Sequence, residues 1–190
     1  MAESFLDSLK SFDKSKLKLT DTKVTTTDGV QLIEKRDSTG SVSVEKTGST
    51  YGFVPSFVED LQVGDVLPGQ LILGSQDVAH DLPMLEQYNV THILNLASYV
   101  KNKFPDRISY KDIKINDLPE VPILQIFKRA FEFIEEGIKS GCVLVHCNAG
   151  VSRCSTVVIG YLMKTRGMTY KDAFDFVKEK RPAICPNEGF

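Results

Sequence analysis

The spacing of apolar residues divides this 190-residue chain near residue 60. Residues 1–60 are rich in Ser, Thr, Lys, Asp and Gly. Within them, only Val30–Ile33 and Val42–Val44 have the alternating pattern of two strands that pair as a hairpin. The rest of this segment has the composition of weakly ordered chain. Beyond it the apolar pattern is dense and regular, so we expect an N-terminal extension at 1–60 and one folded domain at 61–190.

Short apolar runs alternate with longer runs of helical periodicity in the second part of the chain. The short runs are too brief for helices and predict strands, at Leu71–Gly74, Thr91–Leu96, Tyr110–Ile115 and Val143–Val145. Apolar residues at helical spacing predict helices, at His80–Tyr88, Val121–Lys139, Arg153–Thr165 and Tyr170–Lys180. Strands that alternate with helices predict an α/β fold, with a mixed central sheet of about five strands flanked by helices.

Composition and charge narrow the class of protein. Apolar residues make up 42% of the chain and charged residues 25%, which allows a sizeable core. The net charge of −2 gives no reason to expect nucleic acid or an anionic membrane as a partner. No stretch approaches the ~20 apolar residues of a membrane span. Met1–Lys10 carries acids where a secretory signal has a continuous apolar core. We therefore expect an intracellular, cytoplasmic protein, with access to the nucleus left open.

The cysteines leave two interpretations open. No C-x-x-C pair occurs among the four cysteines, and the three histidines complete no zinc spacing. In a reducing compartment a disulfide framework is not expected. The thiols are therefore buried core groups or reactive groups. The sequence gives no reason to expect a metal or another cofactor.

One segment combines a buried strand, a loop of small residues and the start of a helix. The strand Val143–Val145 leads through His146 to Cys147, and the helix begins near Arg153. A loop that enters a helix N-terminus directs several backbone N–H groups into one small volume, where an anion binds. The same field favours the nucleophilic thiolate form of Cys147. The predicted phosphate loop consists of Asn148, Ala149, Gly150, Val151, Ser152 and Arg153.

Arg153 is the most informative residue of this segment. A cation at a helix N-terminus opposes the helix dipole, so an anion bound between the guanidinium and the loop N–H groups explains its presence. A guanidinium grips two phosphate oxygens at once. The alternative is a core thiol beside a buried histidine, with a surface arginine at this spacing by chance. That alternative does not account for the small loop residues.

The segment His146-Cys147-x5-Arg153 matches the signature of the protein tyrosine phosphatase superfamily. From Asp60 to Phe190 the chain resembles an atypical dual-specificity protein phosphatase. Such proteins lack the rhodanese-like domain of the MAP kinase phosphatases, for which this chain has no room. The flanking segments that carry the resemblance are Leu73–Asp77, Thr91–Asn95, Asp117–Glu120, Tyr161–Met163 and Pro186–Asn187.

A thiolate nucleophile needs a proton donor for the departing phenol or alcohol. Four acids upstream of the loop are candidates: Asp106, Asp112, Asp117 and Glu120. A general acid in a loop is preferred over one in a strand. The residues by themselves therefore leave two candidates, Asp117 and Glu120. The resemblance implies Asp117, because the family's general acid directly follows the strand before the long helix. A solvated or helix-capping acid is the alternative interpretation.

The resemblance implies a protein phosphatase that hydrolyses phosphotyrosine and phosphoserine or phosphothreonine through a phosphocysteine intermediate. Cys147 is then the nucleophile, Arg153 the phosphate clamp and Asp117 the general acid, with no metal. The implied partners are phosphorylated proteins, MAP kinases or their upstream kinases, in stress-activated MAP kinase signalling. One alternative is a slow or inactive pseudophosphatase that serves as a phosphoprotein-binding or scaffold module. Another is a phosphatase for inositol lipids or RNA ends, although the uncharged Asn148–Ser152 favours protein substrates.

The chain departs from the family's pattern directly after Arg153. The resemblance implies Ser or Thr at that position, where a hydroxyl assists breakdown of the phosphocysteine. This chain has Cys154, whose thiol is a weaker hydrogen-bond donor. We hypothesise that Cys154 traps oxidised Cys147 as a disulfide, with an inert buried thiol as the alternative. His146 is expected to support the loop through hydrogen bonds.

Three further expectations concern other parts of the chain. Cys142 and Cys185 are expected to be structural thiols. The family continues into a last helix after the position of Phe190. The segment Lys14–Leu19 has the basic and Leu-x-Leu pattern of a kinase-docking motif, although a solvated amphipathic segment has the same pattern.

Overall fold

The computed structural model describes residues 21–25, 30–37, 41–49 and 58–190. The chain divides into two compact units, 1–50 and 51–190. The segment Lys14–Leu19 lies outside the described residues. No helix among the described residues is long and apolar enough to cross a membrane.

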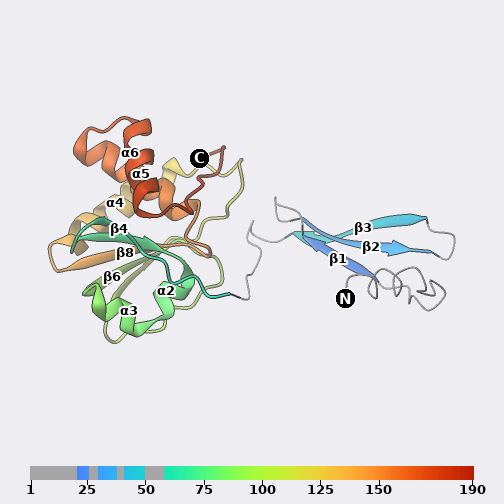
Figure 1. Ribbon diagram of the computed structural model, residues 1–190, viewed down its shortest axis with the longest axis horizontal. Coiled ribbons are helices and arrows are strands. Elements are labelled where there is room, and N and C mark those ends of the chain that lie inside the picture. Colours follow the sequence, from blue (N-terminus) through green and yellow to red (C-terminus); the bar gives the residue numbers. More distant parts are fainter. Residues whose placement is uncertain (1–20, 26–29, 38–40, 50–57) are drawn as a thin grey trace, which may run out of the picture. The chain divides into compact units, whose positions relative to one another are not determined.

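The first unit contains a three-stranded antiparallel sheet (Figure 1). Its strands are β1 (Thr22–Thr25), β2 (Val30–Arg36) and β3 (Val42–Ser49), in that order. The pairing of β2 with β3 is the hairpin that the alternating pattern predicts. Strand β1 lies in a segment predicted to be weakly ordered. Its threonines and valine are β-branched, which suits them to the pleated edge of a sheet.

The second unit is built on a mixed five-stranded sheet, as the sequence predicts. The strand order is β4-β5-β8-β6-β7, antiparallel only between β4 and β5. The central strand β8 is buried along its whole length, as expected for parallel strands covered on both faces. The sequence pattern did not reveal β4, whose four residues include a glycine and an aspartate. The strands are β4 (Gly64–Leu67), β5 (Leu71–Gly74), β6 (Val90–Asn95), β7 (Ser109–Asp112) and β8 (Cys142–His146).

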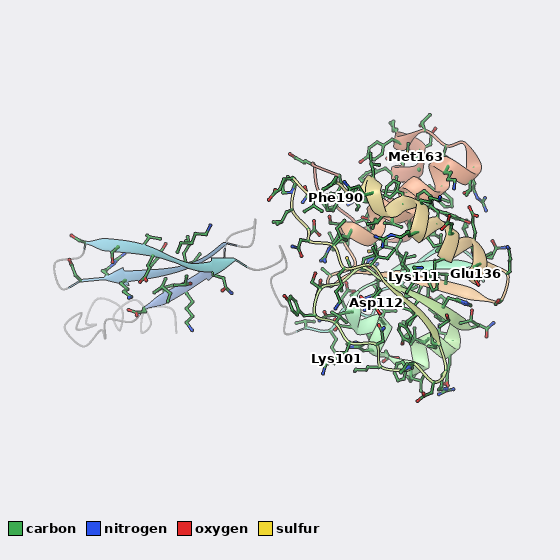
Figure 2. The ribbon with its side chains drawn as sticks, turned by 180° about the vertical axis from the view of Figure 1, so that it is seen from behind. Lys101, Lys111, Asp112, Glu136, Met163 and Phe190 are labelled. Atoms are coloured by element: carbon green, nitrogen blue, oxygen red, sulfur yellow. The ribbon has the colours of Figure 1, made fainter. Side chains whose placement is uncertain are left out.

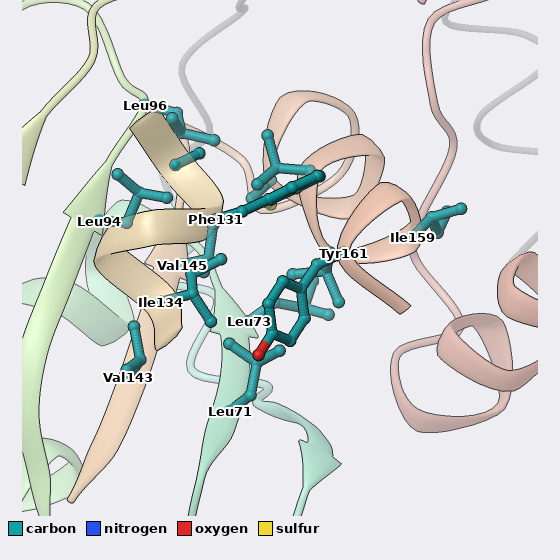
Figure 3. Packing of buried hydrophobic residues seen from close by; sticks show 14 of the residues in the cluster. Leu71, Leu73, Leu94, Leu96, Phe131, Ile134, Val143, Val145, Ile159 and Tyr161 are labelled. Carbon is teal, nitrogen blue, oxygen red and sulfur yellow. The ribbon is translucent and has the colours of Figure 1, made fainter. Parts of the chain in front are cut away.

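Helices cover both faces of this sheet (Figure 1). One face carries α4 (Leu124–Ile138), α5 (Arg153–Arg166) and α6 (Tyr170–Lys180). Figure 3 shows side chains of α4 and α5 packed against side chains of the strands. The ring centroids of Phe131, on α4, and Tyr161, on α5, are 5.7 Å apart. The shorter helices α2 (Gln76–His80) and α3 (Leu82–Gln87) cover the other face.

The prediction of one helix at His80–Tyr88 is wrong at its start. The helix α2 ends at His80, and α3 begins at Leu82. Asp81 separates them, because its carboxylate accepts a hydrogen bond from the N–H of Met84 at 2.8 Å and so caps α3. The predicted stop is correct, since Asn89 has a left-handed φ of 52° after the helix end.

The topology brings three loops to one edge of the sheet. Strands β5, β8 and β6 are neighbours and run parallel, so their C-terminal ends lie side by side. In the register of this sheet, His146 lies between Gly74 and Asn95. Ligands of open parallel sheets bind beyond such strand ends. The loop that follows β8 is therefore in the position of a functional site.

Candidate active site

The loop after β8 has a sharply defined backbone. It extends from Cys147 to Ser152 and leads directly into α5. Gly150 has a φ of 68°, and a Cβ on it would lie 2.5 Å from the backbone carbon of Gly74. Only glycine satisfies both the left-handed conformation and this close approach. The phosphate loop predicted from the sequence is thus held against the end of β5.

The Cys147 thiol lies inside this loop and is 1% exposed. Its Sγ lies 3.5 Å from the Sγ of Cys154, on the first turn of α5. The hydrogen bond from Cys154 is the largest of several effects that lower the pKa of Cys147 to about 5; burial opposes them. The charge of Arg153 and the backbone N–H groups of Cys154 and Val151 lower the pKa further. Cys147 is therefore a thiolate at neutral pH.

The Cys154 thiol stays protonated and acts as the donor of this pair. Burial raises its pKa well above the usual value, and the neighbouring Cys147 raises it further. The two thiols thus have opposite shifts in pKa. These opposite directions favour the thiolate form of Cys147 and the protonated form of Cys154.

The Arg153 guanidinium is 1% exposed and is held on all three of its nitrogens. Its Nη2 donates to the Oδ1 of Asn148 at 2.9 Å. Its Nη1 donates to the carbonyl oxygens of Leu96 and Ile115, at 3.3 and 3.0 Å. Its Nε lies 3.2 Å from the Oδ2 of Asp117. These contacts fix the plane of the guanidinium before any ligand binds.

Asp117 is brought to the loop from the segment between β7 and α4. Its Oδ1 accepts hydrogen bonds from the Ser152 hydroxyl at 2.8 Å and from the Asn187 side-chain amide at 3.2 Å. The backbone N–H of Asn187 also donates to the Ser152 hydroxyl, at 3.1 Å. Sequence reasoning noted Pro186–Asn187 only as part of the resemblance. It missed that Asn187 holds the carboxylate of Asp117.

The other candidate acids lie elsewhere. Asp106 and Glu120 are exposed. Asp112 lies on the outer strand β7, where its Oδ2 accepts a hydrogen bond from the amide of Asn102 at 2.9 Å (Figure 2). Of the four acids considered from the sequence, Asp117 is the one that contacts side chains of the loop, namely Ser152 and Arg153.

His146 and the two remaining cysteines lie in different environments. Burial lowers the pKa of His146 to about 4, so its imidazole is neutral, and Nδ1 lies 3.2 Å from the carbonyl oxygen of Cys147. Cys142 is buried, and burial raises its pKa to about 12. Cys185 is exposed, so the expectation of a structural thiol is wrong there. The backbone N–H of Cys185, rather than its side chain, contacts the loop, at the carbonyl oxygen of Val151.

The arrangement is suited to one kind of chemistry. A buried thiolate, a fixed guanidinium, the N-terminus of α5 and a carboxyl group meet within one loop. Such a loop can bind a tetrahedral anion, whose central atom a thiolate in this position can attack. A carboxyl group in this position can supply a proton to a leaving oxygen.

Comparison with known proteins identifies a family whose chemistry fits this site. Residues 71–190 match the family model described as dual specificity phosphatase, catalytic domain. The chain is 48% identical to mouse Dual specificity protein phosphatase 19 over 187 residues, which cover 96% of this chain and 84% of that protein. The sequence motifs resemble this same atypical dual-specificity phosphatase, which is also called stress-activated protein kinase pathway-regulating phosphatase. The comparison confirms that resemblance.

Two further similar proteins have names that indicate different functions. The Dictyostelium discoideum "MAP kinase phosphatase with leucine-rich repeats protein 3" is 46% identical over 66% of this chain, which corresponds to 15% of that protein. The crystal structure of human tyrosine phosphatase-like serine/threonine/tyrosine-interacting protein superposes with a TM-score of 0.64. It is 38% identical, over 67% of this chain and 89% of that one. The loop geometry, the family model and these relatives agree, and the chain belongs to the dual-specificity protein phosphatase family.

Proposed function

We propose that this protein hydrolyses phosphotyrosine and phosphoserine or phosphothreonine in other proteins, through a phosphocysteine intermediate on Cys147. One observation carries the proposal: the Cys147 thiol, with its pKa lowered to about 5, lies in a loop that also holds the Arg153 guanidinium. A thiolate that is formed at neutral pH and enclosed by donors is suited to attack a phosphate monoester.

In the first step, Cys147 Sγ forms a bond to phosphorus while the bond from phosphorus to the substrate oxygen breaks. The carboxyl group of Asp117 donates its proton to that oxygen. Arg153 and the loop N–H groups stabilise the charge on the remaining phosphate oxygens. The Oδ2 of Asp117 lies 3.2 Å from the Nε of Arg153, so the proposed proton donor and the proposed phosphate clamp are in direct contact.

In the second step, water attacks the phosphorus and Asp117 accepts its proton. The bond between sulfur and phosphorus breaks, and Cys147 leaves as a thiolate. The Cys154 thiol, 3.5 Å away, donates to the departing sulfur and stabilises it. Cys154 thus takes the role that a hydroxyl has in the family, with a weaker donor.

The loop favours proteins as substrates. Asn148–Ser152 contributes no charged side chain, so Arg153 is the one cation within the phosphate loop itself. That is enough for a single phosphate monoester, whereas a polyphosphorylated headgroup calls for further cations. We propose MAP kinases or their upstream kinases as the substrates, supported by the relatives named MAP kinase phosphatases. We propose the cytoplasm as the compartment, where thiols stay reduced.

The first test replaces the nucleophile. We expect Cys147→Ser to lower phosphate release by ~10³-fold or more, because a serine hydroxyl is not ionised at neutral pH. Binding of a phosphopeptide, measured by fluorescence anisotropy, should remain. Turnover is measured on phosphotyrosine and phosphothreonine peptides and on phosphoinositide vesicles.

Three results would contradict the proposed function. Phosphate release by the Ser variant at the wild-type rate would exclude Cys147 as the nucleophile. A wild-type protein that binds phosphopeptide tightly and releases no phosphate would establish the pseudophosphatase alternative. Faster release from phosphoinositides than from peptides would overturn the substrate class.

The second test concerns the general acid. We expect Asp117→Asn to lower kcat by about 10²-fold for phosphopeptides, whose leaving groups need a proton, and by less for p-nitrophenyl phosphate. The basic limb of the pH profile should flatten, because the proposed proton donor is gone. Glu120→Gln is the matched control and should leave both rates unchanged. The reverse pattern, with Glu120→Gln as the damaging change, would show that the acid is misassigned.

The third test concerns the hydrogen bond from Cys154. We expect Cys154→Ala to raise the pKa of Cys147, because the largest of the effects that lower it is lost. At pH 6, alkylation of Cys147 by iodoacetamide should then slow, by about twofold for the first unit of pKa increase and by nearly tenfold for each unit once the pKa exceeds the pH. Cys154→Ser should restore the low pKa of Cys147, measured as the pH midpoint of the alkylation rate, since a hydroxyl also donates a hydrogen bond. All variants carry Cys185→Ser to remove the exposed thiol. If the pH midpoint of alkylation is the same in all of them, Cys154 does not lower the pKa of Cys147.

The fourth test concerns oxidation by hydrogen peroxide. The Cys147 thiolate attacks one peroxide oxygen and releases hydroxide, which gives a sulfenic acid. Cys154 sulfur, 3.5 Å away in the reduced protein, then attacks that sulfur, and water leaves as the disulfide forms. We expect peptide mapping to find the Cys147–Cys154 linkage and dithiothreitol to restore activity. The control Cys154→Ser should be inactivated irreversibly. Recovery of Cys147 only as sulfinic or sulfonic acid, without a linked peptide, would exclude the disulfide.

A further inference from the structure

Four successive carbonyl groups of the phosphate loop accept hydrogen bonds from outside the loop. The carbonyl oxygen of Asn148 accepts from the N–H of Gln76 at 3.0 Å, and that of Val151 accepts from the N–H of Cys185 at 3.0 Å. The two carbonyl groups between them, those of Ala149 and Gly150, both accept from the side chain of Arg181.

The direction of these carbonyl groups fixes the direction of the loop's N–H groups. In a planar trans peptide, the C=O of one residue and the N–H of the next point in opposite directions. Carbonyl groups that are turned outward therefore leave the following N–H groups free to point inward, as an anion-binding nest requires. Whatever holds the carbonyl groups outward also maintains the phosphate site.

Arg181 follows α6 directly and is fully buried, at 0% exposure. Its Nε donates to the Gly150 carbonyl at 2.8 Å, and its Nη2 donates to the Ala149 carbonyl at 3.1 Å. Nη2 also lies 2.5 Å from Asp60 Oδ2, and Nη1 donates to the carbonyl oxygen of Gln62. The guanidinium therefore links the rear of the loop to the segment that precedes β4. Its charge is balanced by Asp60.

The charge of Arg181 also reaches the interior of the loop. Burial dominates the raised pKa of Cys154, and the charges of Arg181 and Arg153 oppose that rise. The loop thus lies between two buried guanidinium groups. Arg153 contacts it through Asn148, within the loop, and Arg181 contacts it through the backbone from behind.

We infer that Arg181 is a positioning residue for phosphate binding, which holds the Ala149 and Gly150 carbonyl groups outward so that the loop N–H groups face the phosphate. The inference rests on the proposed function. Without Arg181, the carbonyl groups of Ala149 and Gly150 lose these partners, and Gly150 has the backbone freedom to let an adjacent peptide rotate. A rotated peptide replaces an N–H donor with a carbonyl oxygen that repels the anion.

The test compares four full-length proteins: wild type, Arg181→Met, Arg181→Lys and Arg107→Met. Arg107 is the matched control, since it pairs with Glu86 at the surface, where both side chains are more than half exposed. Affinity for inorganic phosphate is measured by protection of Cys147 from iodoacetamide, in a Cys185→Ser background. This readout needs no turnover. Circular dichroism establishes that each variant is folded.

We expect Arg181→Met to raise the Kd for phosphate by about tenfold or more, the scale of one lost hydrogen bond to a charged group. Arg181→Lys keeps the charge but lacks the fork that reaches two carbonyl groups, so its Kd should be intermediate. Arg107→Met should bind phosphate as the wild type does. In steady-state hydrolysis of p-nitrophenyl phosphate, both Arg181 variants should have a higher KM.

A purely structural role would give a different result. A folded Arg181→Met protein that melts at lower temperature, yet binds phosphate with a Kd within about twofold of the wild type, would overturn the inference. If the Met variant does not fold, the folded Lys variant with unchanged Kd would overturn it in the same way. Absence of wild-type turnover would refute the proposed function and leave the phosphate Kd values to decide the role of Arg181.

Discussion

The thiolate of Cys147 is buried at the end of β8, and the surrounding structure has to stabilise its negative charge. Cys147 is 1% exposed, and moving a charge of this size out of water costs several kcal/mol in a real protein. The cost is offset by the Cys154 thiol, the Arg153 guanidinium and two backbone N–H groups. All of them belong to the loop or to the first turn of α5, so the thiolate is stable only while the loop keeps its conformation.

The two buried arginines make that conformation dependent on distant segments. Arg153 is paired with Asp117, 36 residues earlier, and Arg181 with Asp60, 121 residues earlier. Asn187, near the end of the chain, holds the other oxygen of Asp117. A buried charge that loses its partner is strongly destabilising. Loss of these pairings would therefore damage the fold and the site together, and functional tests have to separate the two effects.

The sequence predicted those parts of the structure that depend on local spacing. The strand, loop and helix around Cys147 follow from contiguous residues, and α4 and α6 follow from apolar periodicity. The split between α2 and α3 was missed because it depends on one capping aspartate within an apolar pattern. The contacts of Arg181 and Asn187 were missed for a different reason. They join segments that lie far apart in the chain, and no periodicity of a single segment records which residues meet in space.

The replacement of a hydroxyl by a thiol at Cys154 affects the two steps of the proposed reaction in opposite ways. A thiol is a weaker donor than a hydroxyl and lowers the pKa of Cys147 less. A thiolate of higher pKa is intrinsically the stronger nucleophile and the poorer leaving group. In the proposed reaction, Cys154 therefore favours formation of the phosphocysteine relative to its breakdown. The proposed bond from sulfur to phosphorus then gains lifetime, and its hydrolysis still requires the proposed base, Asp117, to activate water.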